Sequence, residues 1–397
     1  MKDFSAIGEQ LIQACPKSLR EIACRVVEQR PLSLDDGVQL FEDPDLLAVG
    51  QLANFVRERL HGDITYFNRN LHLNSTNVCE ADCLFCSFAR LKSGMPQAYT
   101  MSVDTAIQWI RERYQPGMTE VHIVNGLNPD LTFDYYIDLL RAIRLEFPTL
   151  HIKAFTAVEI HYFAEKYGKS YEQVLRELVD AGLASLPGGG AEMFAPRARK
   201  KLCRDKVDAD GWLEVHRTAH RLGLKSNCTM LYGTVERIDE RVDHLIRLRD
   251  QQSESGGFQA FIPLAYHPEG NRLGAIGAPT GADDLRTIAV SRLVLNNIPH
   301  IKAYWIMLGI KVAQIAQRFG ANDLDGTVTE EKVYHMAGAD TPNSLSIEEL
   351  KALIRGVGRE PVERTTTYQI IDEQDPQNAE IERGMSLITA ATVEQQA

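Results

Sequence analysis

From Leu71 onward, short apolar runs alternate with amphipathic segments, and this alternation most constrains the fold. It is typical of βα units arranged around a parallel sheet. Strands are expected at 71–77, 120–126, 151–159, 184–188, 225–233, 258–267, 301–307 and 320–328. Helical spacing is found between them, at 103–114, 133–147, 162–181, 211–222, 237–252, 283–296 and 310–319. Such a chain closes most simply into an α/β fold of the (β/α)8 TIM-barrel type, with its chemistry at the C-terminal ends of the strands.

The two ends of the chain differ from this repeat. Two leader helices are expected, one opening at Pro16 and one capped by Asp45, and a closing helix is expected over 347–357. A polar tail begins at Glu373. The predicted organisation is therefore a helical leader over 1–62, a barrel over 63–372 and a tail over 373–397.

Composition and charge narrow the function classes. Hydrophobic residues make up 44% of the chain and charged residues 24%, which excludes low-complexity and mainly disordered proteins. The net charge of -11 opposes sequence-independent binding to a phosphate backbone. No stretch approaches the ~20 apolar residues of a membrane span, and the start shows no secretory signal. We therefore expect a cytoplasmic protein without nucleic-acid or membrane partners.

The strongest chemical signal is a group of three cysteines, Cys79, Cys83 and Cys86, in the loop after the first expected strand. Structural zinc normally takes four N/S ligands, and no second Cys/His pair follows at a suitable distance. Three thiolates in a short loop instead suit a four-iron, four-sulfur (4Fe-4S) cluster with one iron left open. The alternative, three buried small residues, fits poorly with a loop that also carries Glu80 and Asp82. The remaining cysteines stand apart, and Cys24 and Cys228 are expected to be core thiols.

Polar and glycine residues at the expected strand ends are further candidates. The run Gly188-Gly189-Gly190 lets the backbone approach a ligand closely, or it forms a tight turn. Glu192 could accept hydrogen bonds from ribose hydroxyls. Glu159 could act in the same way, or it could be an acid at a helix N-terminus.

Two charged or titratable side chains are expected near the barrel mouth. Lys302 and Tyr304 share a face of the seventh expected strand, so Lys302 either points inward and binds a carboxylate or faces outward. His267 ends the sixth strand, where it either contacts a ligand or is a hydrogen-bonded structural residue.

The spacing CxxxCxxC, with Phe85 just before the third cysteine, resembles the radical S-adenosylmethionine (SAM) superfamily. The resemblance implies that the open iron binds SAM, and that electron transfer into the sulfonium leaves a 5′-deoxyadenosyl radical. It implies that Phe85 packs beside the adenine, that Gly233 supports the adenine through its backbone, and that Gly126 approaches the SAM amino group. A reducing electron donor such as flavodoxin or ferredoxin is also implied.

A narrower resemblance extends from about Leu52 to Tyr368. The segments that carry it are 72–77, 154–159, 186–192, 229–233, 256–263 and 323–327. They resemble the aminofutalosine (aminodeoxyfutalosine) synthase family of menaquinone biosynthesis. This implies that the adenosyl radical adds to 3-[(1-carboxyvinyl)oxy]benzoate, with rearrangement and decarboxylation, to give aminodeoxyfutalosine and methionine. SAM is then a consumed co-substrate.

The implied substrate carries two carboxylates, for which Arg197 and Lys302 are the candidate partners and His267 a third. No catalytic residue is assigned beyond the cluster ligands. Two alternatives stay open. One is a related radical SAM enzyme of the dehypoxanthine futalosine cyclase or deazaflavin (FO) synthase type, and the other is a non-catalytic iron-sulfur protein.

Overall fold

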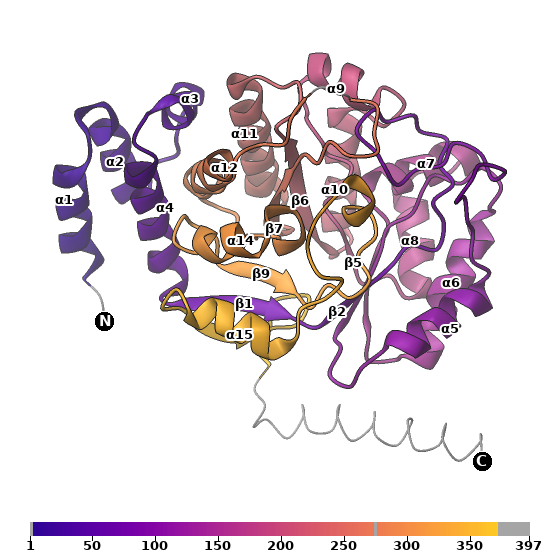
Figure 1. The fold of residues 1–397 in the computed structure, drawn as a ribbon. Helices are drawn as coiled ribbons and strands as arrows, with labels where there is room; N and C mark the ends of the chain where they lie inside the picture. Colours follow the sequence, from indigo (N-terminus) through magenta and orange to yellow (C-terminus); the bar gives the residue numbers. More distant parts are fainter. Residues whose placement is uncertain (1–2, 274–275, 372–397) are drawn as a thin grey trace.

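Four helices and a short 3-10 turn precede the sheet in the computed structural model, which describes residues 3–273 and 276–371 (Figure 1). They are α1 (Phe4–Ala14), η1 (Lys17–Leu19), α2 (Arg20–Val27), α3 (Leu34–Glu42) and α4 (Leu46–His61). Asp45 caps α4 as expected, because its side chain accepts a hydrogen bond from the Ala48 N–H at 2.9 Å. The expectation of two leader helices omitted α1 and α3.

A curled parallel sheet forms the centre of the molecule, and its strands pair in chain order. They are β2 (Asn70–Leu73), β3 (Glu120–Ile123), β4 (His151–Ala154), β5 (Ser185–Leu186), β6 (Lys225–Tyr232), β7 (Phe258–Ala265) and β8 (His300–Ile301). An eighth strand, β9 (Asp323–Gly326), lies between the two edges. The Ala303 N–H donates to the Asp323 carbonyl at 2.8 Å, and the His72 N–H donates to the Thr329 carbonyl at 2.9 Å. The expected barrel-type α/β fold is confirmed.

Helices follow the strands and pack their apolar faces on the sheet (Figure 1). They are α5 (Val103–Arg113), α6 (Phe133–Glu146), α7 (Ala157–Tyr167), α8 (Tyr171–Ala181), α9 (Pro196–Cys203), α10 (Ala209–Arg221), α11 (Ile238–Ser255), α12 (Gly281–Val294), α13 (Trp305–Leu308), α14 (Ile310–Ala316), the 3-10 turn η2 (His335–Ala337) and α15 (Ile347–Arg355). The core is continuous from strand residues such as Ile152 and Leu186 to helix residues such as Leu245 and Leu350.

Three expected boundaries were wrong. The third strand ends at Ala154, because Thr156 and Glu159 form a capping box that starts α7. The seventh strand ends at Ile301, so Tyr304 is the N-cap of α13 and not a strand residue. The single helix expected over 162–181 is two helices, because Gly168 ends α7 in a left-handed conformation with φ of 62°.

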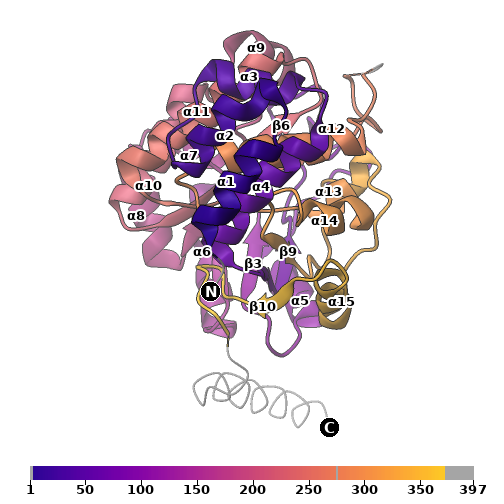
Figure 2. The ribbon, with the colours of Figure 1, turned by 90° about the vertical axis from the view of Figure 1, so that its left-hand side faces the viewer.

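A second, three-stranded parallel sheet was not expected. It has the order β10-β1-β9, with β1 (Ile64–Asn68) in the middle and β10 (Glu360–Glu363) at its edge. In this way residues near the end of the described chain pair with the strand that precedes the barrel. On one side of the barrel α4 packs against α12, and α1 and α2 pack against α4 (Figure 1 and Figure 2).

The division into a leader over 1–62 and a barrel over 63–372 stays a prediction, and the tail over 373–397 lies outside the described residues. No helix in the described part of the chain has the length and apolar character to cross a membrane.

Candidate functional site

The three cysteines of the CxxxCxxC motif line one cavity of about 120 Å³ at the C-terminal end of the sheet. Cys79 and Cys83 are buried, and Cys86 is half-buried. Burial raises the pKa of the Cys79 and Cys83 thiols, so a bound metal must displace their protons. Over residues 3–273 and 276–371, no three His, Cys, Asp or Glu side chains converge on a single ion position. Three thiols around a shared cavity nevertheless fit a 4Fe-4S cluster, since in a cluster each thiolate binds its own iron.

Backbone hydrogen bonds hold the cysteine loop against the strand ends. The Gly126 N–H donates to the Thr76 carbonyl at 3.0 Å, and the Glu80 N–H donates to the Leu127 carbonyl at 3.0 Å. A Cβ at Gly126 would lie 2.2 Å from the Val78 carbonyl oxygen, so no side chain fits there. Gly126 also lines the cavity of the cysteines. Glycine is therefore required at position 126, because the cysteine loop passes too close to it for any side chain.

Glu159 lines the same cavity from the N-terminus of α7. Its carboxylate accepts hydrogen bonds from the Thr156 N–H at 2.8 Å and the Asn125 N–H at 3.1 Å. Burial nevertheless raises the pKa of Glu159 to about 7. Glu159 is thus a helix N-terminal acid that also lines the cavity, and its contact with ribose hydroxyls stays a prediction.

The glycine run after β5 divides into two roles. A Cβ at Gly188 would lie 2.8 Å from the backbone of β6, so Gly188 permits close packing of the strands. The Gly189 carbonyl accepts a hydrogen bond from the indole N–H of Trp212 at 3.2 Å. Gly190, with φ of 85°, is the member of the run that lines the cavity of the cysteines.

Glu192 connects this cavity with a second one. Its carboxylate accepts from the Lys206 ammonium at 2.7 Å, and the same ammonium lies 5.3 Å from the centre of the Phe85 ring. Lys206 lines the cavity of the cysteines, whereas Glu192 and Phe85 line the second cavity. Burial alone would lower the pKa of Lys206, but the nearby Cys83 and Glu192 raise it well above its usual value. Lys206 therefore carries a positive charge between the two cavities.

The second cavity, of about 70 Å³, is mostly apolar. Its lining residues are Phe85, Cys86, Ser87, Glu192, Leu231, Ala265, Tyr266, His267, Val333, Tyr334 and Ala337. The His267 Nε2–H donates to the Met307 carbonyl at 2.9 Å, and the His267 ring packs edge-on against Tyr334. His267 is thus held in place at the expected end of the barrel.

Comparisons with known proteins agree with this geometry. The profile of the "Radical SAM superfamily" matches residues 73–248, and that of the "CofH/MqnC C-terminal region" matches residues 255–377. The chain is 49% identical to the aminodeoxyfutalosine synthase of Thermus thermophilus, over 88% of this chain and 94% of that one. It is 46% identical to the aminodeoxyfutalosine synthase of Streptomyces coelicolor, over 90% and 95%. The chain belongs to the aminodeoxyfutalosine synthase family of radical SAM enzymes.

The family's barrel is also seen among solved structures. The crystal structure of methylornithine synthase (PylB) superimposes with a TM-score of 0.67, covering 85% of this chain and 96% of that one. At 18% sequence identity this likeness concerns the fold alone.

Five of the expected site residues do not line either cavity in this family member: Gly188 and Gly189, described above, and Arg197, Gly233 and Lys302. Arg197 is half exposed, and its guanidinium pairs with the Glu240 carboxylate at 2.6 Å. Gly233 forms a turn with φ of 84°, in which its N–H donates to Glu236 at 2.7 Å. Lys302 points into the barrel but is buried against Asp325, with 2.5 Å between Nζ and Oδ1. Neither cation is offered to a ligand in this arrangement.

Sequence reasoning missed Lys206 and Tyr334. Lys206 stands in a run of basic residues in which nothing singles it out, and its partner Glu192 is 14 residues earlier. Tyr334 lies in an irregular segment just before the η2 turn, where periodicity carries no information. A second polar layer inside the barrel was also missed, namely the ion pair between Lys153 and Glu120 at 2.5 Å.

Proposed function

We propose that this chain joins the adenosyl group of SAM to 3-[(1-carboxyvinyl)oxy]benzoate, giving aminodeoxyfutalosine and methionine in menaquinone biosynthesis. The observation that carries the proposal is near-full-length identity of 49% and 46% to two proteins named aminodeoxyfutalosine synthase. The agreement of both names favours this reaction over the cyclase and FO synthase types. The mapping of three cysteines to one cavity supports a radical SAM centre over a merely structural role for the loop.

Cys79, Cys83 and Cys86 would hold a 4Fe-4S cluster through their thiolates. When bound, the cluster supplies the electron that cleaves the sulfonium of SAM. Gly190 and Glu159 border the space beside the cysteines, where SAM would lie. Lys206 borders the same space, and its partners Glu192 and Phe85 line the second cavity. A carboxylate, an ammonium and an aromatic ring would thus lie near a ligand with an amino acid group and an adenosine.

The remaining task of the protein is to orient the acceptor and to exclude water. Leu231, Ala265, Tyr266 and Tyr334 supply an apolar wall that suits a benzoate ring. His267, held by the Met307 carbonyl, is our candidate for contact with a substrate carboxylate. A protein reductant and a cytoplasmic location complete the proposal, since the cluster must be reduced and its cysteines are free thiols.

The deciding experiment is anaerobic reconstitution with iron and sulfide, followed by mass analysis of SAM-derived products with and without the enolpyruvyl benzoate. We expect aminodeoxyfutalosine and methionine only when the benzoate is present. Free 5′-deoxyadenosine as the main stoichiometric product would assign the chain to the hydrogen-abstracting type. An intact cluster without SAM cleavage would indicate a non-catalytic iron-sulfur protein.

Two cysteine variants provide a matched control for that experiment. Cys83→Ala should lose both iron and SAM cleavage, because the loop holds no spare thiol. Cys228→Ala should keep both, since Cys228 is fully buried in β6 and away from the motif. Normal iron content in Cys83→Ala would contradict the assignment of the cluster ligands.

A further inference from the structure

The segment 197–206 concentrates positive charge in an otherwise acidic chain. It holds six basic residues and one acidic residue, whereas the whole chain has a net charge of -11. Lys200, Lys201 and Arg204 are exposed on α9 and just beyond its end. The net charge of the whole chain does not reveal this segment, because its charges gather on a single short helix and just beyond its end.

Several basic side chains on and beside α9 have a partner within the protein. Arg197 pairs with Glu240, and the buried Arg199 donates to backbone carbonyls, among them that of Ala191 at 2.7 Å. Arg204 lies 3.6 Å from its neighbour Asp205. Throughout the described ranges, the side chains of Lys200 and Lys201 have no ion-pair partner.

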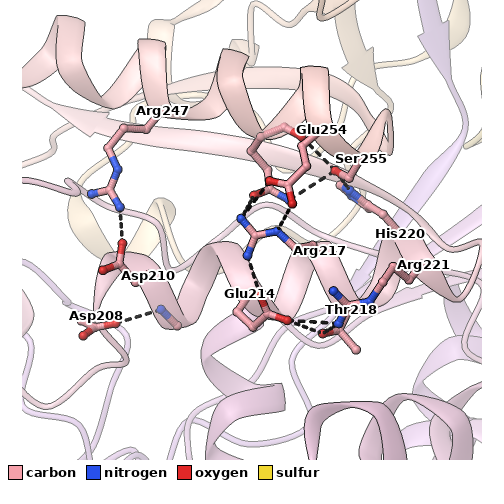
Figure 3. Close-up of polar contacts among 12 residues, drawn as sticks. Asp208, Asp210, Glu214, Arg217, Thr218, His220, Arg221, Arg247, Glu254 and Ser255 are labelled. Atoms are coloured by element: carbon pink, nitrogen blue, oxygen red, sulfur yellow. Dashed lines mark hydrogen bonds and ion pairs between the residues drawn. The ribbon is translucent and has the colours of Figure 1, made fainter.

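The neighbouring surface of α10 and α11 is charge-balanced in contrast (Figure 3). Arg217 pairs with Glu214 at 2.5 Å and with Glu254 at 2.8 Å, and Arg247 pairs with Asp210. Figure 3 shows that these side chains point toward one another and not outward. The uncompensated positive charge on this side of the molecule is therefore on α9.

The basic helix also packs against the cysteine loop. The Leu84 N–H donates to the Leu202 carbonyl at 3.0 Å, and the Asp82 N–H donates to the Asp205 carboxylate at 3.1 Å. A surface hollow of about 280 Å³ is lined by Lys200, Arg204 and Lys206 among others. Lys206 lines the cysteine cavity as well, so this side chain borders both the hollow and the proposed cluster site.

We propose that the exposed cations Lys200, Lys201 and Arg204 are the docking surface for a small acidic electron-carrier protein of the flavodoxin class. Charge complementarity selects an acidic partner, since surface charge of one sign steers a protein of the other sign into productive encounters. Docking here places the carrier's redox group beside the hollow that shares Lys206 with the cysteine cavity. The inference rests on the proposed function in that a 4Fe-4S cluster needs a reductant. In each encounter the reduced flavin loses one electron and the oxidised cluster gains it, with no bond made or broken.

The test compares cluster reduction by two reductants in a charge-reversed variant, Lys200→Glu/Lys201→Glu/Arg204→Glu. Bleaching of the iron-sulfur absorbance is followed by stopped flow in reconstituted protein, with reduced flavodoxin or with dithionite. At low ionic strength we expect flavodoxin-driven reduction to slow by about 10-fold or more, since electrostatic steering commonly contributes 10-fold to 1,000-fold to association rates. Dithionite-driven reduction should be unchanged within about twofold. The difference between variant and wild type should shrink at high salt, because added ions screen the charges.

A second triple variant, Arg141→Glu/Lys311→Glu/Arg355→Glu, changes the net charge equally. Its exposed cations lie on α6, α14 and α15, away from α9 (Figures 1 and 2). Equal slowing in both triple variants would overturn the proposal, because net charge alone would then explain the effect. Slowing with dithionite to the same extent as with flavodoxin would also overturn it, since the variant would then have damaged the cluster. The rate of cluster bleaching is measured without any product of the reaction. If the proposed reaction is wrong, the cluster is still reduced normally but no aminodeoxyfutalosine is formed, so the two failures can be told apart.

Discussion

Lys206 and Glu192 form an ion pair of 2.7 Å that lies between two cavities, one lined by the three motif cysteines and one lined by Phe85 and His267. Glu192 holds a left-handed backbone conformation with φ of 46°, which is uncommon for a residue with a side chain. The rigid position of the carboxylate keeps the ammonium beside the cysteine loop. This pair therefore fixes one charged group in each of the cavities that the proposed reaction uses.

Breaking the pair should weaken SAM binding. We expect Glu192→Gln to lower SAM affinity more than Glu192→Asp does, because only Asp keeps a charged acceptor for Lys206 and for ribose hydroxyls, worth about 1.5 to 3 kcal/mol. Equilibrium binding of SAM to the reconstituted enzyme measures this. The double variant Glu192→Gln/Lys206→Met should lose less than the sum of the single losses, because the two residues share one interaction. Strict additivity would show that the pair does not act as a unit.

Gly126→Ala should disturb the cysteine loop although no cysteine is replaced. The new Cβ would lie 2.2 Å from the Val78 carbonyl oxygen and 3.0 Å from the Cys79 Cβ, so the loop must move. We expect lower iron and sulfide content per chain after reconstitution. Gly94 lies in the cysteine loop, and a Cβ added there would meet no atom within 4 Å. Gly94→Ala is therefore the control and should incorporate a normal cluster. Equal iron content in the two variants would contradict the role given to Gly126.

Lys302→Met should reduce stability more than substrate affinity. Lys302 and Asp325 are both buried, and although burial opposes it, the ammonium keeps the pKa of Asp325 below its usual range. Removing one partner of a buried ion pair costs about 3 to 5 kcal/mol. We expect a lower midpoint of urea unfolding for Lys302→Met. The double variant Lys302→Met/Asp325→Asn should recover part of the loss, because it leaves no unpaired buried carboxylate. Asn suits this position, since it tolerates the left-handed backbone of residue 325. A normal midpoint together with a raised KM for the benzoate would instead assign Lys302 to substrate binding.

His335 should make the stability of the 331–341 segment depend on pH. Its Nδ1 lies 2.6 Å from the Glu331 carbonyl and its Nε2 2.9 Å from the Thr341 carbonyl, so both ring nitrogens act as donors. The Glu331 carboxylate, which lies 3.5 Å from the same Nδ1, raises the pKa of His335 to about 9. Because the folded pKa is higher than the unfolded value of about 6.5, the stabilisation is complete below pH ~6.5 and is lost as the pH rises through about 9.

The measurement is amide hydrogen exchange in 331–341 for wild type and His335→Gln. The two proteins should differ most at or below pH 6.5 and should converge above pH 9, after correction for the intrinsic pH dependence of exchange. A difference that grows with pH would contradict the protonated state of His335.

Local patterns were sufficient for the order of the barrel strands and for the three-cysteine motif. The spacing of apolar residues predicted eight strand regions, because the apolar side chains that mark each buried strand lie within the strand itself. The CxxxCxxC spacing predicted the cysteine group because all three ligands lie within one loop. The T-x-x-E pattern at Thr156 and Glu159 could also have been used, since a capping box is a sequence-local signal that marks the start of α7.

Only the tertiary structure could decide the partners of charged residues. Lys302 has its carboxylate 23 residues later on the adjacent β9, and Arg197 has its carboxylate 43 residues later on α11. No sequence pattern distinguishes a lysine neutralised inside a barrel from one that awaits a substrate. The pairing of β1 with β10 was invisible for the same reason, because it joins residues nearly 300 positions apart.

The sequence by itself determined the βα repeat, the three-cysteine motif and, through its family likeness, the proposed chemistry. These depend on interactions between near neighbours in the chain or on residues kept together in one loop. The tertiary structure alone decided that Lys206 stands between the two cavities, that Arg197 and Lys302 are already paired, and that basic α9 lies over the cysteine loop. Such placements follow from packing between distant segments, where burial and charge pairing select one arrangement out of many that the local sequence allows.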